Sequence, residues 1–98
     1  MSTYRLAIIT PNGKIFDDQV EFLSAPGTEG SFGVLNHHAP MVSTLRKGVV
    51  SIQQNNVEKF FALNSGVLEV DSQSNVLLLS DTVASGQSKE EAASKLNN

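Results

Sequence analysis

The sequence predicts an all-β domain, an antiparallel sandwich or flattened barrel, followed by a short helical tail. Two features predict the sheet. From Thr3 to about Asp81, short runs rich in β-branched and aromatic residues alternate with turn residues, roughly every eight to twelve positions. Before residue 88, no run keeps the apolar period of about 3.6 residues that a helix would show. The 98-residue length allows one modest core, so we expect one domain of about eight to ten strands.

Turn residues divide the β-rich region into strands. The predicted strands, in order, are Thr3–Thr10, Lys14–Phe16, Gln19–Ala25, Ser31–Leu35, Val42–Leu45, Val49–Gln53, Val57–Leu63, Val67–Asp71 and Val76–Ser80. Pro11-Asn12-Gly13 closes the first hairpin, because proline presets one turn dihedral and Asn-Gly supplies positive φ. Pro26-Gly27 ends the third run.

The later strands are separated in the same way. Their turns are Lys47-Gly48, Asn55-Asn56, Ser65-Gly66 and Ser72–Asn75. Leu68 and Val70 face one way and the acidic residues beside them face the other, as in a strand with one buried face. Val76–Ser80 begins with an unbroken apolar run, which predicts a strand covered on both faces.

The end of the chain has a different composition. Ser85-Gly86-Gln87 is predicted to be a linker. Ser88 to Glu91 fits a capping box, in which the Ser88 hydroxyl accepts the Glu91 N–H and Glu91 reaches back to Ser88. We therefore assign residues 1–84 to a β-sandwich domain. Residues 85–98 are assigned to a linker and the start of a truncated or vestigial helix that reaches Leu96.

Composition excludes several classes of function. Hydrophobic residues make up 40% and charged residues 17%, which is typical of a globular protein. The net charge of −3 argues against nucleic-acid binding, and the absence of cysteine excludes disulfides and thiol catalysis. Apolar runs such as Leu6–Ile9 are far shorter than the roughly twenty residues of a membrane-spanning helix, so no direct membrane insertion is expected. The composition favours an intracellular setting.

The residues that suggest a catalytic or metal site have plainer interpretations. Gly27, Gly30 and Gly33 match neither a phosphate loop nor a dinucleotide loop, so we interpret them as turn glycines. The adjacent histidines His37 and His38 would point to opposite faces of a strand, so they would not converge on one metal ion.

The acidic residues beside the first hairpin, Asp17, Asp18 and Glu21, are expected to be solvated rather than to act as paired catalytic carboxylates. Of Phe60 and Phe61, one is expected to point inward and the other outward. We therefore predict no catalytic, cofactor-binding or metal-binding residue. The residues by themselves predict a small β-domain that binds another protein and is not an enzyme.

Five ordered motifs resemble the epsilon subunit of F-type, proton-translocating ATP synthases. They are Leu6–Gly13 with Phe16, Pro26–Leu35, His38–Val42 with Leu45–Val50, Ser65–Val70, and Asn75–Ala84. The likeness runs from residue 4 to about residue 92 with family-like spacing. It implies a ten-stranded antiparallel β-sandwich, or flattened barrel, with no catalytic residue and no cofactor.

The resemblance also implies a function and two partners. Members of the family lie in the central stalk of the rotor, contact the gamma subunit and the loops of the membrane c-ring, and help couple proton transport to ATP synthesis. The resemblance therefore implies a peripheral subunit, on the cytoplasmic face of a bacterial inner or plasma membrane or at the equivalent plastid or mitochondrial position.

Particular residues follow from the resemblance. The loop predicted to face the c-ring contains Glu29, Gly30, Ser31 and His38. The residues predicted to contact gamma are Thr10, Ala39, Pro40, Met41, Val42, Leu79, Ser80, Asp81 and Thr82. The sequence departs from the family at Ser31, which is often acidic, and at Asn36-His37, which stands in place of "P-G".

Family members commonly continue into a two-helix hairpin that inhibits ATP hydrolysis in many bacteria and binds ATP in some. Only Ser88–Leu96 corresponds to it here, so we expect neither inhibition nor a nucleotide site in this chain. We also expect weak self-association of the isolated domain through the surface that gamma would cover. The alternative is a free-standing β-sandwich that binds a protein or another ligand. Such a module would be expected to expose a platform of aromatic side chains, but this chain has one tyrosine and no tryptophan.

Overall fold

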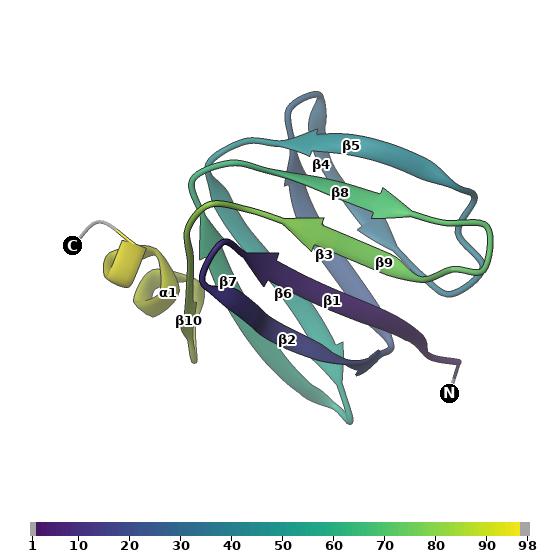
Figure 1. Cartoon of the computed structure of the whole chain (residues 1–98). Coiled ribbons are helices and arrows are strands. Elements are labelled where there is room, and N and C mark those ends of the chain that lie inside the picture. Colours follow the sequence, from purple (N-terminus) through teal and green to yellow (C-terminus); the bar gives the residue numbers. More distant parts are fainter. Residues whose placement is uncertain (1, 97–98) are drawn as a thin grey trace.

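A computed structural model describes residues 2–96 as ten strands followed by one helix (Figure 1). The strands are β1 (Tyr4–Thr10), β2 (Gly13–Val20), β3 (Phe22–Gly27), β4 (Gly30–Val34), β5 (Met41–Leu45), β6 (Gly48–Gln54), β7 (Val57–Leu63), β8 (Gly66–Val70), β9 (Val76–Leu79) and β10 (Val83–Gly86). The helix α1 spans Lys89–Leu96. The predicted fold class, a ten-stranded sandwich or flattened barrel with a helical tail, is confirmed.

The strands form a single curved sheet. Its order is β10-β7-β6-β3-β5-β8-β9-β1-β2, and β4 pairs with β3 outside this path. Most neighbours are antiparallel, but β1 and β9 are parallel, with Leu6 beside Val76 and Ile8 beside Leu78. The predicted antiparallel sheet therefore has one exception, which joins the two ends of the β-rich region.

The sheet encloses an apolar core. The largest fully buried side chains are Leu6, Ile8, Leu23, Ile52, Leu63, Leu68, Leu78, Val20, Val34, Val50 and Val70. They come from strands throughout the sheet. In β1 and β8 they alternate with more exposed residues, as period-two strands require, whereas consecutive residues are buried in β3, β6 and β7. Phe61 is buried and Phe60 is partly exposed, so the prediction that one phenylalanine points inward and one outward is confirmed.

Two predicted strand assignments in the first half are wrong. The second strand does not stop at Phe16 but continues to Val20, and the third begins at Phe22 rather than Gln19. The break falls at Glu21, whose N–H donates to the Gln53 carbonyl of β6. Pairing between β1 and β2 also skips Ile15, which forms a β-bulge on β2.

Two other predictions for the second half are wrong. Val76–Ser80 is not covered on both faces, because Leu79 is 45% exposed while Leu78 is fully buried. The predicted linker Ser85-Gly86-Gln87 contains the end of β10, which pairs with β7 through Gly86.

The helix α1 packs against β10 and β7, at the left in Figure 1. Ala92 is fully buried there, and a Cβ on Gly86 would lie 2.5 Å from the Ala92 nitrogen. The predicted cap at Ser88 is present, since the Glu91 N–H donates to its hydroxyl over 3.0 Å. The return bond differs from the prediction: the Glu91 carboxylate accepts the N–H of Gln87 rather than that of Ser88.

Candidate functional site

Strands β5, β8, β9 and β1 present one face to the core and the other to the surface. Leu68 and Leu78 are fully buried, whereas Val67 on β8 and Leu79 on β9 are 39% and 45% exposed. The strand registers place Thr44, Val67, Leu79 and Ile9 side by side across the four strands. We call these four residues the outer row. They form a largely apolar strip on the outside of the sheet.

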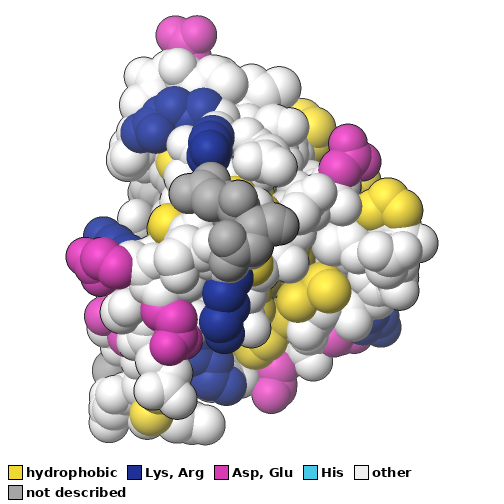
Figure 2. Space-filling view, turned by 90° about the vertical axis from the view of Figure 1, so that its left-hand side faces the viewer, with side chains coloured by type: hydrophobic (Ala, Val, Ile, Leu, Met, Phe, Trp, Pro, Cys, Tyr) yellow, Lys and Arg dark blue, Asp and Glu magenta, His cyan; other side chains and the backbone are white. Residues whose placement is uncertain are grey.

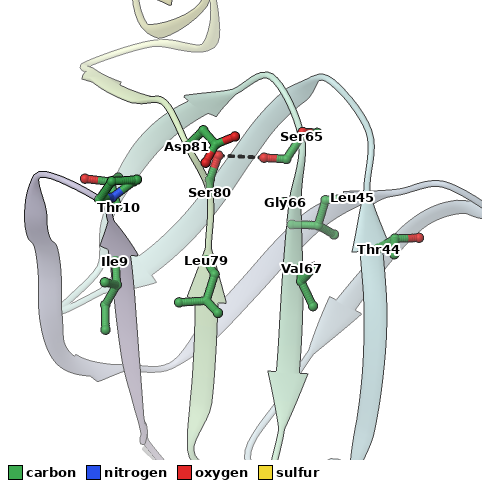
Figure 3. Close-up of a pocket in the computed structure, with 11 residues that line it drawn as sticks. Ile9, Thr10, Thr44, Leu45, Ser65, Gly66, Val67, Leu79, Ser80 and Asp81 are labelled. Carbon is green, nitrogen blue, oxygen red and sulfur yellow. Dashed lines mark hydrogen bonds between the residues drawn. The ribbon is translucent and has the colours of Figure 1, made fainter.

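The outer row opens into a shallow hollow of about 600 Å³ at the ends of the same strands (Figure 3). The hollow is lined by Ile9, Thr10, Pro11, Thr44, Leu45, Ser65, Gly66, Val67, Leu79, Ser80 and Asp81. In Figure 3 these residues come from neighbouring strands and from the turns that follow them. Apolar side chains with a few polar groups around them suit contact with another protein.

Hydrogen bonds from Ser80 hold the strand ends together beneath the hollow. Its hydroxyl donates to the Ser65 carbonyl over 2.6 Å, the bond dashed in Figure 3. Its N–H donates to the Ile9 carbonyl over 3.2 Å. Gly66 allows the strands to approach closely, because a Cβ there would lie 2.6 Å from the Leu79 carbonyl oxygen. These contacts fix the shape of the hollow.

The structure separates the predicted gamma-contact residues into two groups. Thr10, Leu79, Ser80 and Asp81 line the hollow, and Thr82 follows them in sequence. Thr10 and Ser80 are only 8% exposed, so the accessible surface of this group comes from Leu79, Asp81 and Thr82.

The second group precedes or begins β5. Ala39 and Pro40 are exposed just before the strand, and Met41 is partly buried at its start. Val42 is 69% exposed and lies on the same face as the outer row. The two groups therefore lie toward opposite ends of one sheet face.

The predicted c-ring loop is also divided by the structure. Glu29 lies in the exposed two-residue turn between β3 and β4, and Gly30, with a φ of 130°, and Ser31 are the exposed first residues of β4. His38 lies beyond the other end of β4, in the connection to β5. The turn is tied to β5, since the Thr28 N–H donates to the Thr44 carbonyl over 3.0 Å. The polar turn therefore adjoins the hollow through Thr44, whereas His38 does not.

The two histidines have separate environments. The His37 N–H donates to the Ser74 hydroxyl over 3.0 Å, and the residue has a φ of 68°. The His38 ring lies 2.7 Å from the Ala39 carbonyl through Nδ1. Among residues 2–96, no group of three or more side chains of the metal-binding types is placed to hold an ion.

The acidic residues near the first hairpin also do not converge. Asp17 accepts hydrogen bonds from Arg5 and Lys14 at 2.7 Å, which hold the pKa of its carboxyl far below the usual range. Asp18 accepts the N–H of Gln19, and Glu21 accepts that of Asn55. Each carboxylate has a separate structural contact, and the three do not share a pocket.

The charges on the α1 side of the molecule are mixed. Figure 2 shows acidic and basic side chains scattered over this surface, with small groups of apolar side chains between them. Acidic side chains lie close to the basic ones on this side, whereas a nucleic-acid site would require a basic stripe.

Sequence reasoning missed three members of the outer row, Ile9, Thr44 and Val67. Val67 could have been found, because it precedes Leu68 and Val70 in a strand whose alternate residues are buried. The alignment of Thr44 and Ile9 with Val67 and Leu79 depends on pairing between distant segments, which the sequence does not show.

The described fold and surface define a small β-sandwich protein with an apolar contact face and a polar turn at its edge. The sequence profile described as "ATP synthase, Delta/Epsilon chain, beta-sandwich domain" matches residues 3–86. The chain belongs to this family.

Curated relatives agree with this assignment. The chain is 44% identical over 85 residues to the ATP synthase epsilon chain of Sulfurovum sp. (strain NBC37-1), a match that covers 86% of this chain and 66% of that protein. It is 39% identical over 95 residues to the ATP synthase epsilon chain of Aliarcobacter butzleri (strain RM4018), covering 97% of this chain and 76% of that protein. The chain thus spans about two thirds to three quarters of these relatives.

Solved structures share the fold. A chain in the Euglena gracilis mitochondrial ATP synthase matches with a TM-score of 0.81 at 17% identity, over 87% of this chain and 54% of that one. A chain in the central stalk and c-ring structure of the Tetrahymena thermophila mitochondrial ATP synthase matches with a TM-score of 0.71 at 16% identity, over 84% and 66%. At these identities the likeness concerns the fold.

Proposed function

We propose that this chain is a non-catalytic subunit of the central stalk of an F-type ATP synthase. It links the gamma subunit to the c-ring and helps couple proton transport through the ring to ATP synthesis. Family membership and the exposed outer row support this proposal together. Among residues 2–96, no helix is long and apolar enough to span a membrane. The subunit is held at the membrane by its partners, on the cytoplasmic side in a bacterium.

The outer row and hollow are the proposed gamma site. Apolar side chains such as Leu79 and Val67 remain exposed in the middle of a regular sheet, where water contact is unfavourable. Covering them would contribute roughly 25 cal/mol for each Å² of apolar surface buried. Asp81 and Thr44 at the edge of the hollow supply polar groups that would orient the partner. The same face is expected to associate weakly with itself when gamma is absent.

The turn at Glu29, Gly30 and Ser31 is the proposed c-ring contact. It is exposed, carries one acidic side chain, and has little side-chain bulk around a glycine with positive φ. Such a turn allows the backbone to approach polar loops closely. His38 lies at the other end of β4, so we assign it to the β5 end of the gamma-facing surface instead.

A capture experiment with purified gamma and a purified c-ring tests both contacts. Leu79→Lys should weaken capture by gamma, because it places a charge in the outer row. Val57→Lys is the matched control, because Val57 is 55% exposed and lies on β7, away from this face. Ser31→Arg should weaken capture by the c-ring and leave capture by gamma unchanged. If neither partner captures the unsubstituted chain, the alternative of a free-standing binding module gains support.

A further inference from the structure

The sheet has three strands with a free edge in the described part of the chain. β10 and β2 lie at the two ends of the strand order, and β4 pairs with β3 alone. A free edge offers unpaired N–H and C=O groups to any other strand, so proteins usually protect such edges. The three edges differ in whether they are protected.

The β2 edge carries several protective features. Lys14 and Asp17 place charges on the strand, and the bulge at Ile15 interrupts its regular path. The side-chain amide of Gln54 also donates to the Gln19 carbonyl over 2.9 Å, which occupies one acceptor of this strand. The β10 edge is protected differently, because α1 packs against that strand.

The β4 edge has no charges, no bulge and no covering helix, and its one side-chain hydrogen bond, from the Tyr4 hydroxyl to the Val34 carbonyl, reaches only the last residue of the strand. Its sequence, Gly30–Val34, contains no charged residue and no proline. Ser31 and Gly33 are both exposed. The strand is short, but it is composed mainly of small residues that would let another backbone approach closely.

The main-chain groups of Ser31 and Gly33 point outward from this edge. The Arg46 N–H donates to the Pro26 carbonyl over 2.9 Å, and the Thr28 N–H donates to the Thr44 carbonyl over 3.0 Å. Pro26 and Thr28 therefore turn their main-chain groups toward β5.

The main-chain N–H and C=O groups of successive strand residues point in opposite directions, so those of Ala25 and Gly27 point toward β4. Their partners there are Phe32 and Gly30. Ser31 and Gly33 alternate with these two residues along β4, so their main-chain N–H and C=O groups face away from β3.

We propose that β4 is a strand-pairing site for a second copy of this chain. Two β4 strands related by a two-fold axis near Phe32 would run antiparallel. Ser31 of each copy would then lie opposite Gly33 of the other, and each of these pairs can exchange two N–H···O=C bonds. The edge is therefore complementary to itself, which a closed two-fold dimer requires.

The flanking residue supports the same arrangement. Leu35 directly follows β4 and is 61% exposed. In the antiparallel pairing it would lie beside the turn at Glu29 of the second copy, where it would be partly covered. The contact is small, so we expect a dissociation constant on the order of 1 mM. This proposal does not depend on the proposed role in ATP synthase.

Amide hydrogen exchange of the unsubstituted chain, followed by NMR below and above about 1 mM, tests the pairing most directly. The Ser31 and Gly33 amides should exchange more slowly at high concentration. The neighbouring Phe32 amide is an internal control, since it already bonds to β3 and should not change. If the exchange rates of the Ser31 and Gly33 amides do not change with concentration, the proposal is overturned, whatever the oligomeric state.

Sedimentation of variants gives a second test. Ser31→Pro removes one outward N–H from each copy without removing a bond to β3, and it should raise the dimer dissociation constant at least about tenfold. Leu79→Lys is the comparison variant, because it would weaken self-association through the outer row and leaves the β4 edge intact. The proposal is overturned if Leu79→Lys abolishes dimerisation and a folded Ser31→Pro variant dimerises as before.

Discussion

Replacing Gly86 with alanine should release α1 from the sandwich. A Cβ at residue 86 would lie 2.5 Å from the Ala92 nitrogen and 2.9 Å from its Cα. Both are backbone atoms of the helix, so they cannot rotate out of the way. Either α1 moves as a unit or it detaches.

The contacts that hold α1 are few. Burial of the Ala92 methyl contributes about 0.8 kcal/mol, and the hydrogen bond from Lys95 Nζ to the Ser85 carbonyl of β10 about 1 kcal/mol. The Ser88 cap, about 1 kcal/mol, and the exposed Lys95–Glu91 pair, roughly 0.3 to 0.5 kcal/mol, stabilise the helix itself and not its docking. Forcing an extra methyl group into a packed site costs about 1–3 kcal/mol. Because the clash costs about as much as the docking contributes, α1 should be largely undocked in Gly86→Ala.

An eight-residue helix is not stable in water without packing, so the released segment should also unfold. Amide hydrogen exchange and helical circular dichroism would show the loss, while the amides of β1 and β8 stay protected. Ser85→Ala is the matched control, because it changes an exposed neighbouring side chain and keeps the Ser85 carbonyl that accepts from Lys95. Unchanged protection of the α1 amides in Gly86→Ala would refute this reasoning.

Three further predictions concern the sandwich. Leu68→Ala empties a fully buried site and should lower the free energy of unfolding by about 2–5 kcal/mol in urea titrations, with Val67→Ala, on the surface, as the milder control. The pKa of Asp17 is lower in the folded chain, so the stabilisation from its carboxylate is present above the unfolded pKa of about 3.9 and is lost as pH falls through the lower folded value. The difference in unfolding free energy between the unsubstituted chain and Asp17→Asn should therefore shrink in acid. A difference that grows in acid would contradict the assignment. Asn56 has a φ of 64°, so Asn56→Val should lower the free energy of unfolding, measured by thermal denaturation, by about 1–2 kcal/mol, and Asn56→Gly should change it little.

Local chemistry explains why much of the sheet could be predicted from the sequence. The Asn55-Asn56 turn is confirmed, with φ values of 54° and 64°, because asparagine tolerates this region of backbone space. The alternation around Leu68 and Val70 correctly gave the buried face of β8.

The errors arise where distant segments decide the outcome. The apolar run from Val76 resembled a strand covered on both faces, but no second layer covers Leu79. The parallel pairing of β1 with β9 joins the two ends of the β-rich region, so no local pattern indicates it. The second strand reaches Val20 because β2 stays paired with β1 past the bulge at Ile15, with Tyr4 beside Val20.

The candidate site was only partly predictable. The family resemblance named Leu79 and Asp81, which the structure places in one hollow with Thr10. It also grouped Glu29 with His38, which are close in sequence but lie at opposite ends of β4. A motif gives the order of residues along the chain, whereas strand direction decides which of them share a surface.

Equilibrium binding of purified gamma subunit to the unsubstituted chain, Leu79→Lys and Val57→Lys is the most direct test of the proposed stalk function. We predict that gamma binds the unsubstituted chain and Val57→Lys equally, and that Leu79→Lys weakens binding at least about tenfold, or about 1.4 kcal/mol. Equal binding to all three would contradict the assignment of the outer row. No binding to any of them would contradict the central-stalk function itself.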